Sequence, residues 1–373
     1  MSARIALVIG QLGQGGAERQ AYLLARGLAG AGEDVRVFCL SEHLNPYGPR
    51  IEEAGVPVTV IARRRSYEPM RAFRLASALR KYKIELVHSF LESATAYSYL
   101  ASFCYRKAVL LPAMRSLPVA EPAIKRLLLG RALRSSPLVL ANSNAGAQAY
   151  SGRCGVDLSR FEVVANAAEK VAEVTAGERL EARRRFGMSE TRPVVGTVGK
   201  DEPDKNIPAF LRLVGGLGHR LGGICSVLAG RGLDEGYAVR SGVRRQSTCE
   251  SYFLGELDDM RLFYSSIDLL VLPSLREGMP NVILEAAAHG VPAVAFDVGG
   301  VREAVEHGRT GMIVPAADEA ALLEAAAELL EDAQRRKSLG ERAREYTAKK
   351  FSVEEMVEST RRAYIRALGG QLG

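Results

Sequence analysis

The fold is decided by the stretch Ser274-Leu-Arg-Glu-Gly-Met-Pro-Asn-Val-Ile-Leu-Glu-Ala-Ala-Ala-His-Gly-Val-Pro-Ala-Val-Ala295. The apolar run 267–273 before it predicts a buried strand that stops at Pro273. A loop follows, Pro280 suits the first turn of a helix, and Gly290 suits its end. Residues 291–296 predict the next strand. This order predicts a parallel α/β sheet, in which ligands collect at the carboxyl ends of the strands.

Two carboxylates, Glu277 and Glu285, lie in this unit. If both were helical, eight residues would separate them by roughly 12 Å. A glycosidase acid/base pair needs about 5–9.5 Å, so the spacing disfavours hydrolysis. We expect the pair to hold two parts of one long polar ligand, with backbone N–H groups at the helix start suited to an anion. The alternative is that Glu277 is a helix-start charge and Glu285 lies on a solvated face.

The segment resembles the retaining family-4 glycosyltransferases of the GT-B fold. The matching residues are Ser274, Glu277, Gly278, Pro280, Glu285, Ala286, Ala288, Gly290, Pro292 and Val294. Residues 299–303 and 308–315 are similar to the segments that follow in that family. The resemblance implies an α/β chain with two Rossmann-like, doubly wound parallel-sheet domains facing across a cleft. Residues 1–170 would bind the acceptor, residues 190–350 would bind the nucleotide sugar, and a helix at 353–373 would cross back onto the first domain.

Length and composition agree with two globular domains. The chain has 373 residues, of which 47% are hydrophobic and 25% charged. No apolar run reaches the 18 residues or so that a membrane span needs. The start of the chain leads into a Gly-rich loop, so we interpret it as a strand and not as a signal peptide. Five cysteines without metal-ligand spacing predict reduced thiols in a cytoplasmic protein and no zinc site.

The net charge of +7 is concentrated in the first half of the chain. Residues 1–190 hold 27 Lys and Arg against 17 Asp and Glu, whereas residues 191–373 hold 23 against 26. The run 63–65 and the helical stretch 118–134 contribute to this excess. Such a face suits peripheral contact with an anionic inner membrane or a phosphate-bearing acceptor, and plain solubilising charge is the alternative. Nucleic acid is disfavoured because no aromatic residues interleave with the basic ones.

The Gly-rich loop 10–19 joins the first expected strand to a helix, where backbone can approach a phosphate. Its spacing departs from the dinucleotide motif because Glu18 occupies the third glycine position. A nicotinamide enzyme stays an alternative, with Glu42 as the ribose-binding acid. The resemblance implies that Gly15 and Gly16 lie near the donor and that Glu18 and Arg19 lie on the acceptor side.

Two further residues are expected on the acceptor side. His88 is expected at the end of a strand, where sites form, although a structural histidine is the alternative. Arg115 stands where many relatives carry a histidine, and it suggests contact with an anionic acceptor or a phosphate.

The second domain opens with a strand followed by Lys200 and Lys205, which flank a turn and place two charges over one anion. The resemblance implies that both hold the nucleotide diphosphate and that Arg231 adds a phosphate contact. It also implies that the backbone of Glu256 and Leu257 meets the nucleobase.

The resemblance implies a retaining hexosyltransferase that uses a UDP- or GDP-sugar and a glycan or lipid-linked acceptor in cell-surface polysaccharide, lipopolysaccharide or glycolipid synthesis. Glu285 would accept bonds from ribose hydroxyls, and Lys200, Lys205 and Glu277 would be catalytic. The sugar would contact Glu277 and the loop residues Gly278, Met279, Pro280 and Asn281. Because no Asp-x-Asp motif lies in a suitable loop, we expect no metal and no cofactor. The alternatives are an epimerase or phosphorylase of the same fold and a non-catalytic subunit of a glycan pathway.

Overall fold

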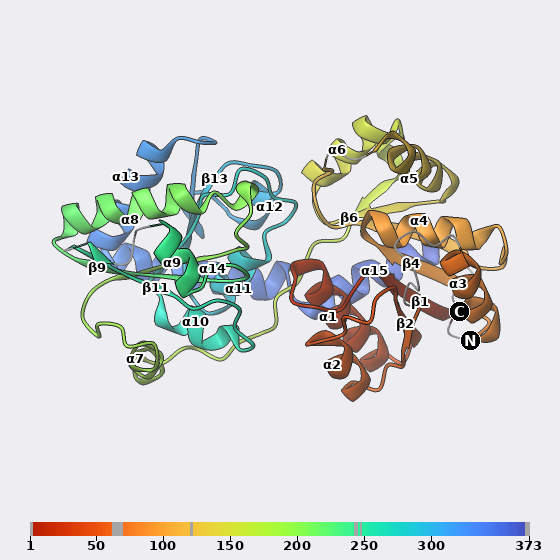
Figure 1. Cartoon of the computed structure of the whole chain (residues 1–373), viewed down its shortest axis with the longest axis horizontal. Coiled ribbons are helices and arrows are strands. Elements are labelled where there is room, and N and C mark those ends of the chain that lie inside the picture. Colours follow the sequence, from red (N-terminus) through yellow and green to blue (C-terminus); the bar gives the residue numbers. More distant parts are fainter. Residues whose placement is uncertain (1–2, 62–69, 120–121, 242–244, 247, 370–373) are drawn as a thin grey trace. The chain divides into compact units, whose positions relative to one another are not determined.

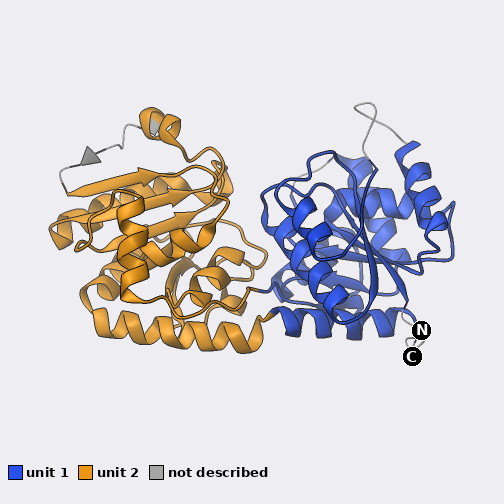
Figure 2. Ribbon diagram, turned by 90° about the horizontal axis from the view of Figure 1, so that it is seen from below, with its two compact units in different colours: residues 1–167, 353–373 blue, residues 168–352 orange. Residues whose placement is uncertain are grey.

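The computed structural model describes residues 3–61, 70–119, 122–241, 245–246 and 248–369. The chain forms two compact units. Unit 1 comprises residues 1–167 and 353–373, and unit 2 comprises residues 168–352 (Figure 2). The basic run 63–65 lies outside the described residues. Within the described ranges, no helix combines the length and the apolar character that crossing a bilayer requires.

Unit 1 is built on a seven-stranded parallel sheet in the order β3-β2-β1-β4-β5-β6-β7 (Figure 1). The strands are β1 (Arg4–Ile9), β2 (Asp34–Cys39), β3 (Val58–Val60), β4 (Leu86–Phe90), β5 (Val109–Met114), β6 (Val139–Ala141) and β7 (Phe161–Val163). Alternate residues of β1 enter different cores, Ile5 and Leu7 on one face and Ala6 and Val8 on the other. Both faces are therefore buried, which explains the nearly continuous apolar strands.

Helices cover both faces of this sheet. They are α1 (Gly16–Gly30), α2 (Tyr47–Glu53), α3 (Met70–Lys81), α4 (Leu91–Ser102), α5 (Ala123–Ser135), α6 (Asn144–Cys154) and α15 (Val353–Ala367). Helices α1, α2 and α15 share one core, and α3 and α4 share the core on the opposite face. The end of the chain thus folds with its beginning, because apolar residues of α15 such as Met356 and Tyr364 pack with those of α1.

Unit 2 also has a seven-stranded sheet, in the order β10-β11-β9-β8-β12-β13-β14. The strands are β8 (Val194–Val198), β9 (Ile224–Ala229), β10 (Arg245–Gln246), β11 (Cys249–Phe253), β12 (Leu269–Leu272), β13 (Ala293–Phe296) and β14 (Gly311–Val314). All neighbours are parallel except β10, which pairs antiparallel with β11 at the edge. The predicted α/β class with two parallel sheets is confirmed.

The helices of unit 2 are α7 (Ala176–Arg185), α8 (Ile207–Leu221), α9 (Glu235–Ser241), α10 (Met260–Ser266), α11 (Asn281–Ala288), α12 (Val301–Ala304), α13 (Glu319–Glu331) and α14 (Ala333–Lys350). Helices α8, α13 and α14 contribute to one core with residues of the central strands. Helix α7 starts with a capping box in which Thr175 and Glu178 bond each other's backbone N–H groups. Its Arg183 then bonds Asp268, which anchors α7 beside β12.

Candidate active site

The candidate site of unit 2 lies where the winding of its sheet changes direction. Strand β8 has β9 on one side and β12 on the other. The sheet continues through β11 and β10 beyond β9, and through β13 and β14 beyond β12. In such a sheet the loops after the two central strands separate and leave a crevice at their carboxyl ends. The loop 199–206 follows β8 and the loop 273–280 follows β12. These loops contain the predicted lysines and the first predicted glutamate.

Three contacts join the two loops. Lys205 Nζ lies 2.6 Å from Glu277 Oε1, Leu275 N donates to the Asp204 carbonyl at 2.8 Å, and Arg276 pairs with Asp204 at 3.0 Å. The Lys205 side chain is 26% exposed and that of Glu277 is 10% exposed, so the lysine is the more accessible side chain of the pair. Two of the predicted site residues, 72 positions apart in sequence, are thereby in direct contact.

Local backbone geometry sets the position of Lys205. The residues after β8 form the short 3₁₀ helix η2 (Pro203–Lys205), and Asn206 adopts φ +50° before α8 begins. Asparagine tolerates this left-handed conformation better than most residues do. The stem of Lys205 packs on Gly199, where an added Cβ would lie 3.2 Å from Lys205 Cγ. Lys200 lies partly exposed at the start of the same loop.

Gly230 lets the loops after β8 and β9 meet. Its φ is +129°, and a Cβ at this position would lie 1.7 Å from the Gly199 carbonyl oxygen. Only glycine fits, because the conformation and the space both exclude a side chain. Backbone bonds Gly199 N to Ala229 O and Asp201 N to Arg231 O then join the loops. The exposed Arg231 side chain lies 3.5 Å from Glu202.

The loop after β11 joins the same edge of the sheet. Gly230 N donates to Gly255 O at 2.7 Å, and Gly255 N donates to Leu233 O at 2.8 Å. Glu256 is exposed and Leu257 is half-buried, directly after this turn. The predicted nucleobase-contacting residues therefore follow a strand next to β9, in a loop bonded to the one that contains Arg231.

Helix α11 begins one residue later than predicted. Pro280 precedes the helix as its N-cap, with ψ of 105°, and does not lie in the first turn. Gly278, Met279 and Pro280 are buried, whereas Asn281 is partly exposed at the first helical position. The Glu277 carbonyl accepts from Gly300 N at 3.3 Å, which ties this loop to the one after β13.

Glu285 lies inside unit 2, in contrast to a glutamate on a solvated face. Glu285 is 8% exposed, and its Oε2 accepts a hydrogen bond of 2.7 Å from the Tyr264 hydroxyl. Sequence reasoning missed Tyr264, because it lies in an ordinary apolar helical stretch and no spacing relates it to Glu285. It also missed the contact of Asp204 with Arg276, which depends on the adjacency of β8 and β12.

In unit 1, the predicted residues Gly15, Gly16, Glu18 and Arg19 occupy the start of α1. Gly15 is the N-cap, and Glu18 folds back over it, so that a Cβ on Gly15 would lie 2.2 Å from Glu18 Oε2. The other oxygen of Glu18 accepts from Gln11 Nε2 at 3.0 Å, and the residue is 9% exposed. A carboxylate at this position also stabilises the helix N-terminus. Gly16 is exposed and Arg19 is half-buried in the same turn.

The predicted position of His88 at a strand end is wrong. His88 is the third of five residues in β4 and is fully buried, stacked on Phe90 at 4.5 Å. Its Nδ1 lies 2.7 Å from the hydroxyl of Tyr364, which belongs to α15. Burial and then the neighbouring Arg115 charge hold the pKa of His88 well below its ordinary value. A polar residue close to a loop suggested a strand end, but all five residues of β4 are buried, and His88 lies in the middle of the strand.

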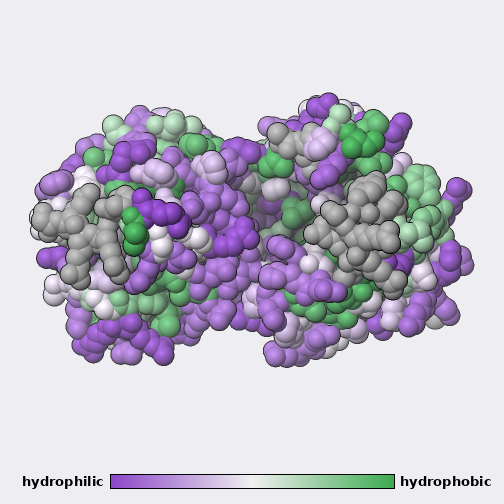
Figure 3. Space-filling view, viewed as in Figure 1, coloured by the Kyte–Doolittle hydropathy of each residue, from purple (hydrophilic) through white to green (hydrophobic). Residues whose placement is uncertain are grey.

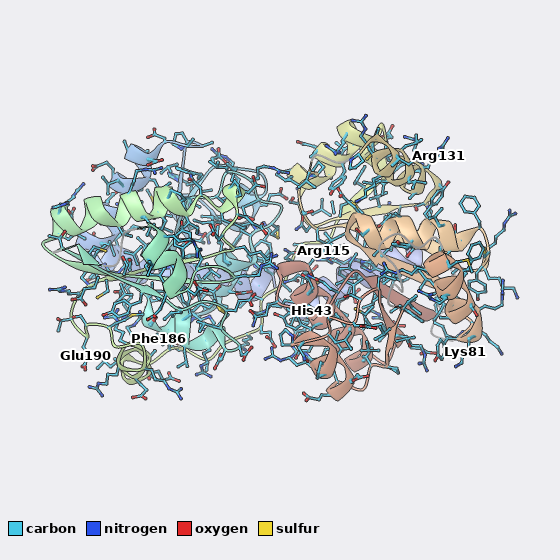
Figure 4. All side chains as sticks on the ribbon, in the orientation of Figure 1. His43, Lys81, Arg115, Arg131, Phe186 and Glu190 are labelled. Atoms are coloured by element: carbon cyan, nitrogen blue, oxygen red, sulfur yellow. The ribbon has the colours of Figure 1, made fainter. Side chains whose placement is uncertain are left out.

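Arg115 follows β5 directly and is also buried (Figure 4). Its Nη1 donates to Asn166 Oδ1 at 2.9 Å, and its guanidinium lies 5.2 Å from the Phe90 ring centroid. Burial lowers the pKa of Arg115 to about 10. His88, Arg115 and Tyr364 therefore form a buried polar cluster of unit 1, and the Phe90 ring packs against His88 and Arg115.

The described parts of the chain contain no group of three or more His, Cys, Asp or Glu side chains arranged to hold a metal ion. The charged groups at the carboxyl edge of the unit 2 sheet are instead the lysines and glutamates described above, which suit an anionic ligand that also carries hydroxyl groups.

Two named proteins are similar to this chain over part of their length. An N-acetyl-alpha-D-glucosaminyl L-malate synthase of Bacillus anthracis is 35% identical over 116 residues, which cover 31% of this chain and 30% of that protein. A D-inositol 3-phosphate glycosyltransferase of Nocardia farcinica (strain IFM 10152) is 29% identical over 301 residues, which cover 77% of this chain and 62% of that protein. The chain thus spans less than two thirds of the length of both relatives.

The fold has solved counterparts. The crystal structure of Anabaena Alr3699/HepE in complex with UDP matches with a TM-score of 0.81 at 19% identity and covers 97% of this chain and 99% of that one. The family model for Glycosyltransferase Family 4 matches residues 14–169, and the model for Glycosyl transferases group 1 matches residues 192–332. With one model on each unit, the chain belongs to the family-4, or group 1, glycosyltransferases, and its fold is GT-B.

Proposed function

We propose that the protein is a retaining, metal-independent hexosyltransferase that uses a nucleoside diphosphate sugar, a UDP- or GDP-sugar, as donor. The carrying observation is the contact of Lys205 with Glu277 at the switch point of the unit 2 sheet, with Lys200 in the same loop. A cationic side chain beside a carboxylate suits a ligand with a diphosphate next to a polyhydroxylated sugar. The Anabaena protein, of the same fold, has been solved with UDP-glucose, which supports this class of donor.

Each group has a role in this proposal. Lys200, Lys205 and the backbone N–H groups at the start of α11 stabilise the charge that grows on the leaving diphosphate, which is the main electrostatic demand of the reaction. Glu277 and the loop Gly278–Asn281 hold the sugar hydroxyls, and Glu285 accepts from the ribose hydroxyls. Arg231 adds a phosphate contact, and the backbone of Glu256 and Leu257 meets the nucleobase.

In this proposal the reaction needs no protein base. The bond between the anomeric carbon and the phosphate oxygen breaks, and the electron pair stays with the diphosphate. The acceptor hydroxyl oxygen attacks the same face of the sugar, and its proton passes to the leaving phosphate oxygen. Configuration at the anomeric carbon is retained, and no metal or cofactor takes part.

The acceptor in this proposal is a glycan or a lipid-linked glycan of cell-surface polysaccharide, lipopolysaccharide or glycolipid synthesis. Support comes from a relative named lipopolysaccharide core biosynthesis mannosyltransferase LpsB in Rhizobium meliloti, 28% identical over half of this chain. We propose that unit 1 binds this acceptor, with Glu18 and Arg19 at the start of α1 on the acceptor side. The protein would act in the cytoplasm at the inner face of the membrane.

We further propose that the layer formed by α3, α4 and α5, called here the basic layer, contacts this membrane. Residues 70–135 hold twelve Lys and Arg against three Asp and Glu, and Arg71 and Arg115 are the buried members of these twelve. Arg131 on α5 and Lys81 at the end of α3 belong to this set (Figure 4). Large apolar side chains are exposed beside these charges, and Figure 3 shows apolar surface there among hydrophilic surface. They are Met70, Phe73, Phe103, Val119, Ile124 and Leu127. Exposed apolar and basic side chains together favour an anionic lipid surface.

The function is tested with Lys205→Ala, and Lys337→Ala serves as the control because Lys337 is an exposed lysine of α14 in the same unit. Purified protein is incubated with UDP- and GDP-sugars, with and without glycan and lipid-linked acceptors, and the anomeric configuration of the product is read by NMR. We expect an α-linked product from an α-linked donor, and a loss of at least about 100-fold in turnover for Lys205→Ala alone. Normal transfer by Lys205→Ala would contradict the diphosphate role. Conversion of the donor without a glycosidic product would favour an epimerase.

A further inference from the structure

The carboxylate of Glu285 is held by a side chain from another helix. Tyr264, on α10, donates its hydroxyl proton to Glu285 Oε2 at 2.7 Å. Tyr264 is fully buried and Glu285 is 8% exposed. Hydrogen bonds from a hydroxyl to an ionised carboxylate are short and strong, and burial from water strengthens them further.

The ring of Tyr264 is itself fixed from two sides. Phe263 packs edge-on against it, with ring centroids 5.3 Å apart, and the His289 ring also packs against it, with centroids 5.1 Å apart. His289 follows α11 directly, and its Nδ1 lies 2.7 Å from the Glu285 carbonyl oxygen. The ring therefore contacts the same turn of α11 that carries the carboxylate.

The sheet below α10 also fixes this arrangement. Gly196 in β8 has no side chain, and a Cβ at this position would lie 2.9 Å from Phe263 Cζ and 2.8 Å from Ile267 Cγ2. Helix α10 can therefore lie directly on β8. The strand that leads to Lys200 and Lys205 thus supports the helix that holds the Glu285 carboxylate.

We propose that Tyr264 is a positioning residue, which orients the Glu285 carboxylate toward the ribose hydroxyls of the donor nucleotide. This inference rests on the proposed function, in which Glu285 contacts the ribose. Loss of the Tyr264 hydroxyl leaves a buried carboxylate with one strong donor fewer, so the carboxylate turns toward other donors. Affinity then falls for ligands that offer the ribose hydroxyl and not for ligands that lack it.

The test compares UDP with 2′-deoxy-UDP, and GDP with 2′-deoxy-GDP, by isothermal titration calorimetry. The proteins are the wild type, Tyr264→Phe, Glu285→Gln and Tyr346→Phe. Phenylalanine keeps the buried ring of Tyr264 and removes only the hydroxyl. Tyr346→Phe is the matched control because it removes a tyrosine hydroxyl that bonds Lys350 on the surface of α14 in the same unit.

For the nucleotide that binds more tightly, we expect the wild type to prefer the ribose form about tenfold or more, and Tyr346→Phe to match it. Tyr264→Phe should lose most of this preference, through weaker binding of the ribose form with unchanged binding of the deoxy form. Equal weakening of both forms would show a structural role only and would overturn the inference. Unchanged preference in Tyr264→Phe, with the preference lost in Glu285→Gln, would also overturn it and leave the proposed function intact. No preference in the wild type itself would instead refute the ribose contact in the proposed function.

Discussion

At the scale of single residues, burial decides the state of the ionisable groups. His88 has its ring inside unit 1 between Phe90 and Tyr364, so the charged imidazolium is disfavoured and its pKa lies well below the ordinary value. Lys205 and Glu277 in unit 2 instead form an ion pair, with 2.6 Å between Nζ and Oε1. Ionisable side chains are thus part of the buried core in unit 1, whereas in unit 2 they are the groups that we propose to bind the donor.

The His88 pKa predicts a pH-dependent stability. Below the ordinary histidine pKa of about 6.5, the unfolded chain binds a proton that the folded protein does not bind. The contribution of neutral His88 to the free energy of unfolding is therefore fully present above about pH 6.5. It falls as the pH drops toward the lower folded-state pKa, by at most about 1.4 kcal/mol per pH unit. Melting temperatures from pH 7.5 to 5 should show the wild type losing more stability than His88→Gln. The exposed His219→Gln variant should follow the wild type, and parallel curves for His88→Gln would contradict the prediction.

At the scale of elements, glycines set how closely helices and strands approach. Gly27 faces α15, and a Cβ there would lie 2.4 Å from Val357 Cγ2 and 3.3 Å from Val353 Cγ1. Gly30, one turn later in α1, has open space around its Cβ position. The two positions lie in one helix and differ in the neighbour that an added methyl group would meet.

This pair gives a matched test of the packing between α1 and α15. Gly27→Ala should destabilise unit 1 by roughly 1–3 kcal/mol, because branched valine side chains of α15 must move. Gly30→Ala should stabilise it by up to about 1 kcal/mol, because alanine favours the helical backbone. Thermal unfolding followed by circular dichroism measures both. Equal effects of the two substitutions would show that α15 does not restrict α1 at Gly27.

At the scale of the whole molecule, the two units share a fold plan and differ in charge. Each has a parallel sheet with its own core, and the basic excess lies in unit 1. The groups proposed to bind the donor lie in unit 2, in loops that follow β8, β9, β11 and β12. We therefore propose that unit 1 contacts an anionic surface and that unit 2 binds a small anionic ligand.

The basic layer predicts salt-sensitive binding to anionic vesicles. The protein should sediment with phosphatidylglycerol-containing vesicles and not with pure phosphatidylcholine, and binding should weaken from 0.1 to 0.5 M salt because charges are screened. The double change of Ile124 and Leu127 to Glu should weaken binding about tenfold. Val239→Glu is the control, since Val239 is an exposed apolar residue of unit 2. Equal binding by all three proteins, or binding independent of lipid charge, would refute the membrane surface.

The sequence by itself determined the alternation of apolar strands and amphipathic helices, the strand and helix around Glu277 and Glu285, and the glycines and lysines of the loops. These features are local, because periodicity and turn residues act over a few positions. Its errors were also local: it put Pro280 inside α11 and His88 at the end of β4.

Only the tertiary structure decided which distant residues meet. The order of strands puts β8 beside β12 and so brings Lys205 to Glu277, 72 positions away. The return of α15 to unit 1 brings Tyr364 to His88, 276 positions away, and the packing of α10 on Gly196 brings Tyr264 to Glu285. Such contacts depend on the packing of whole elements across a buried core, and no short-range pattern in the chain encodes them.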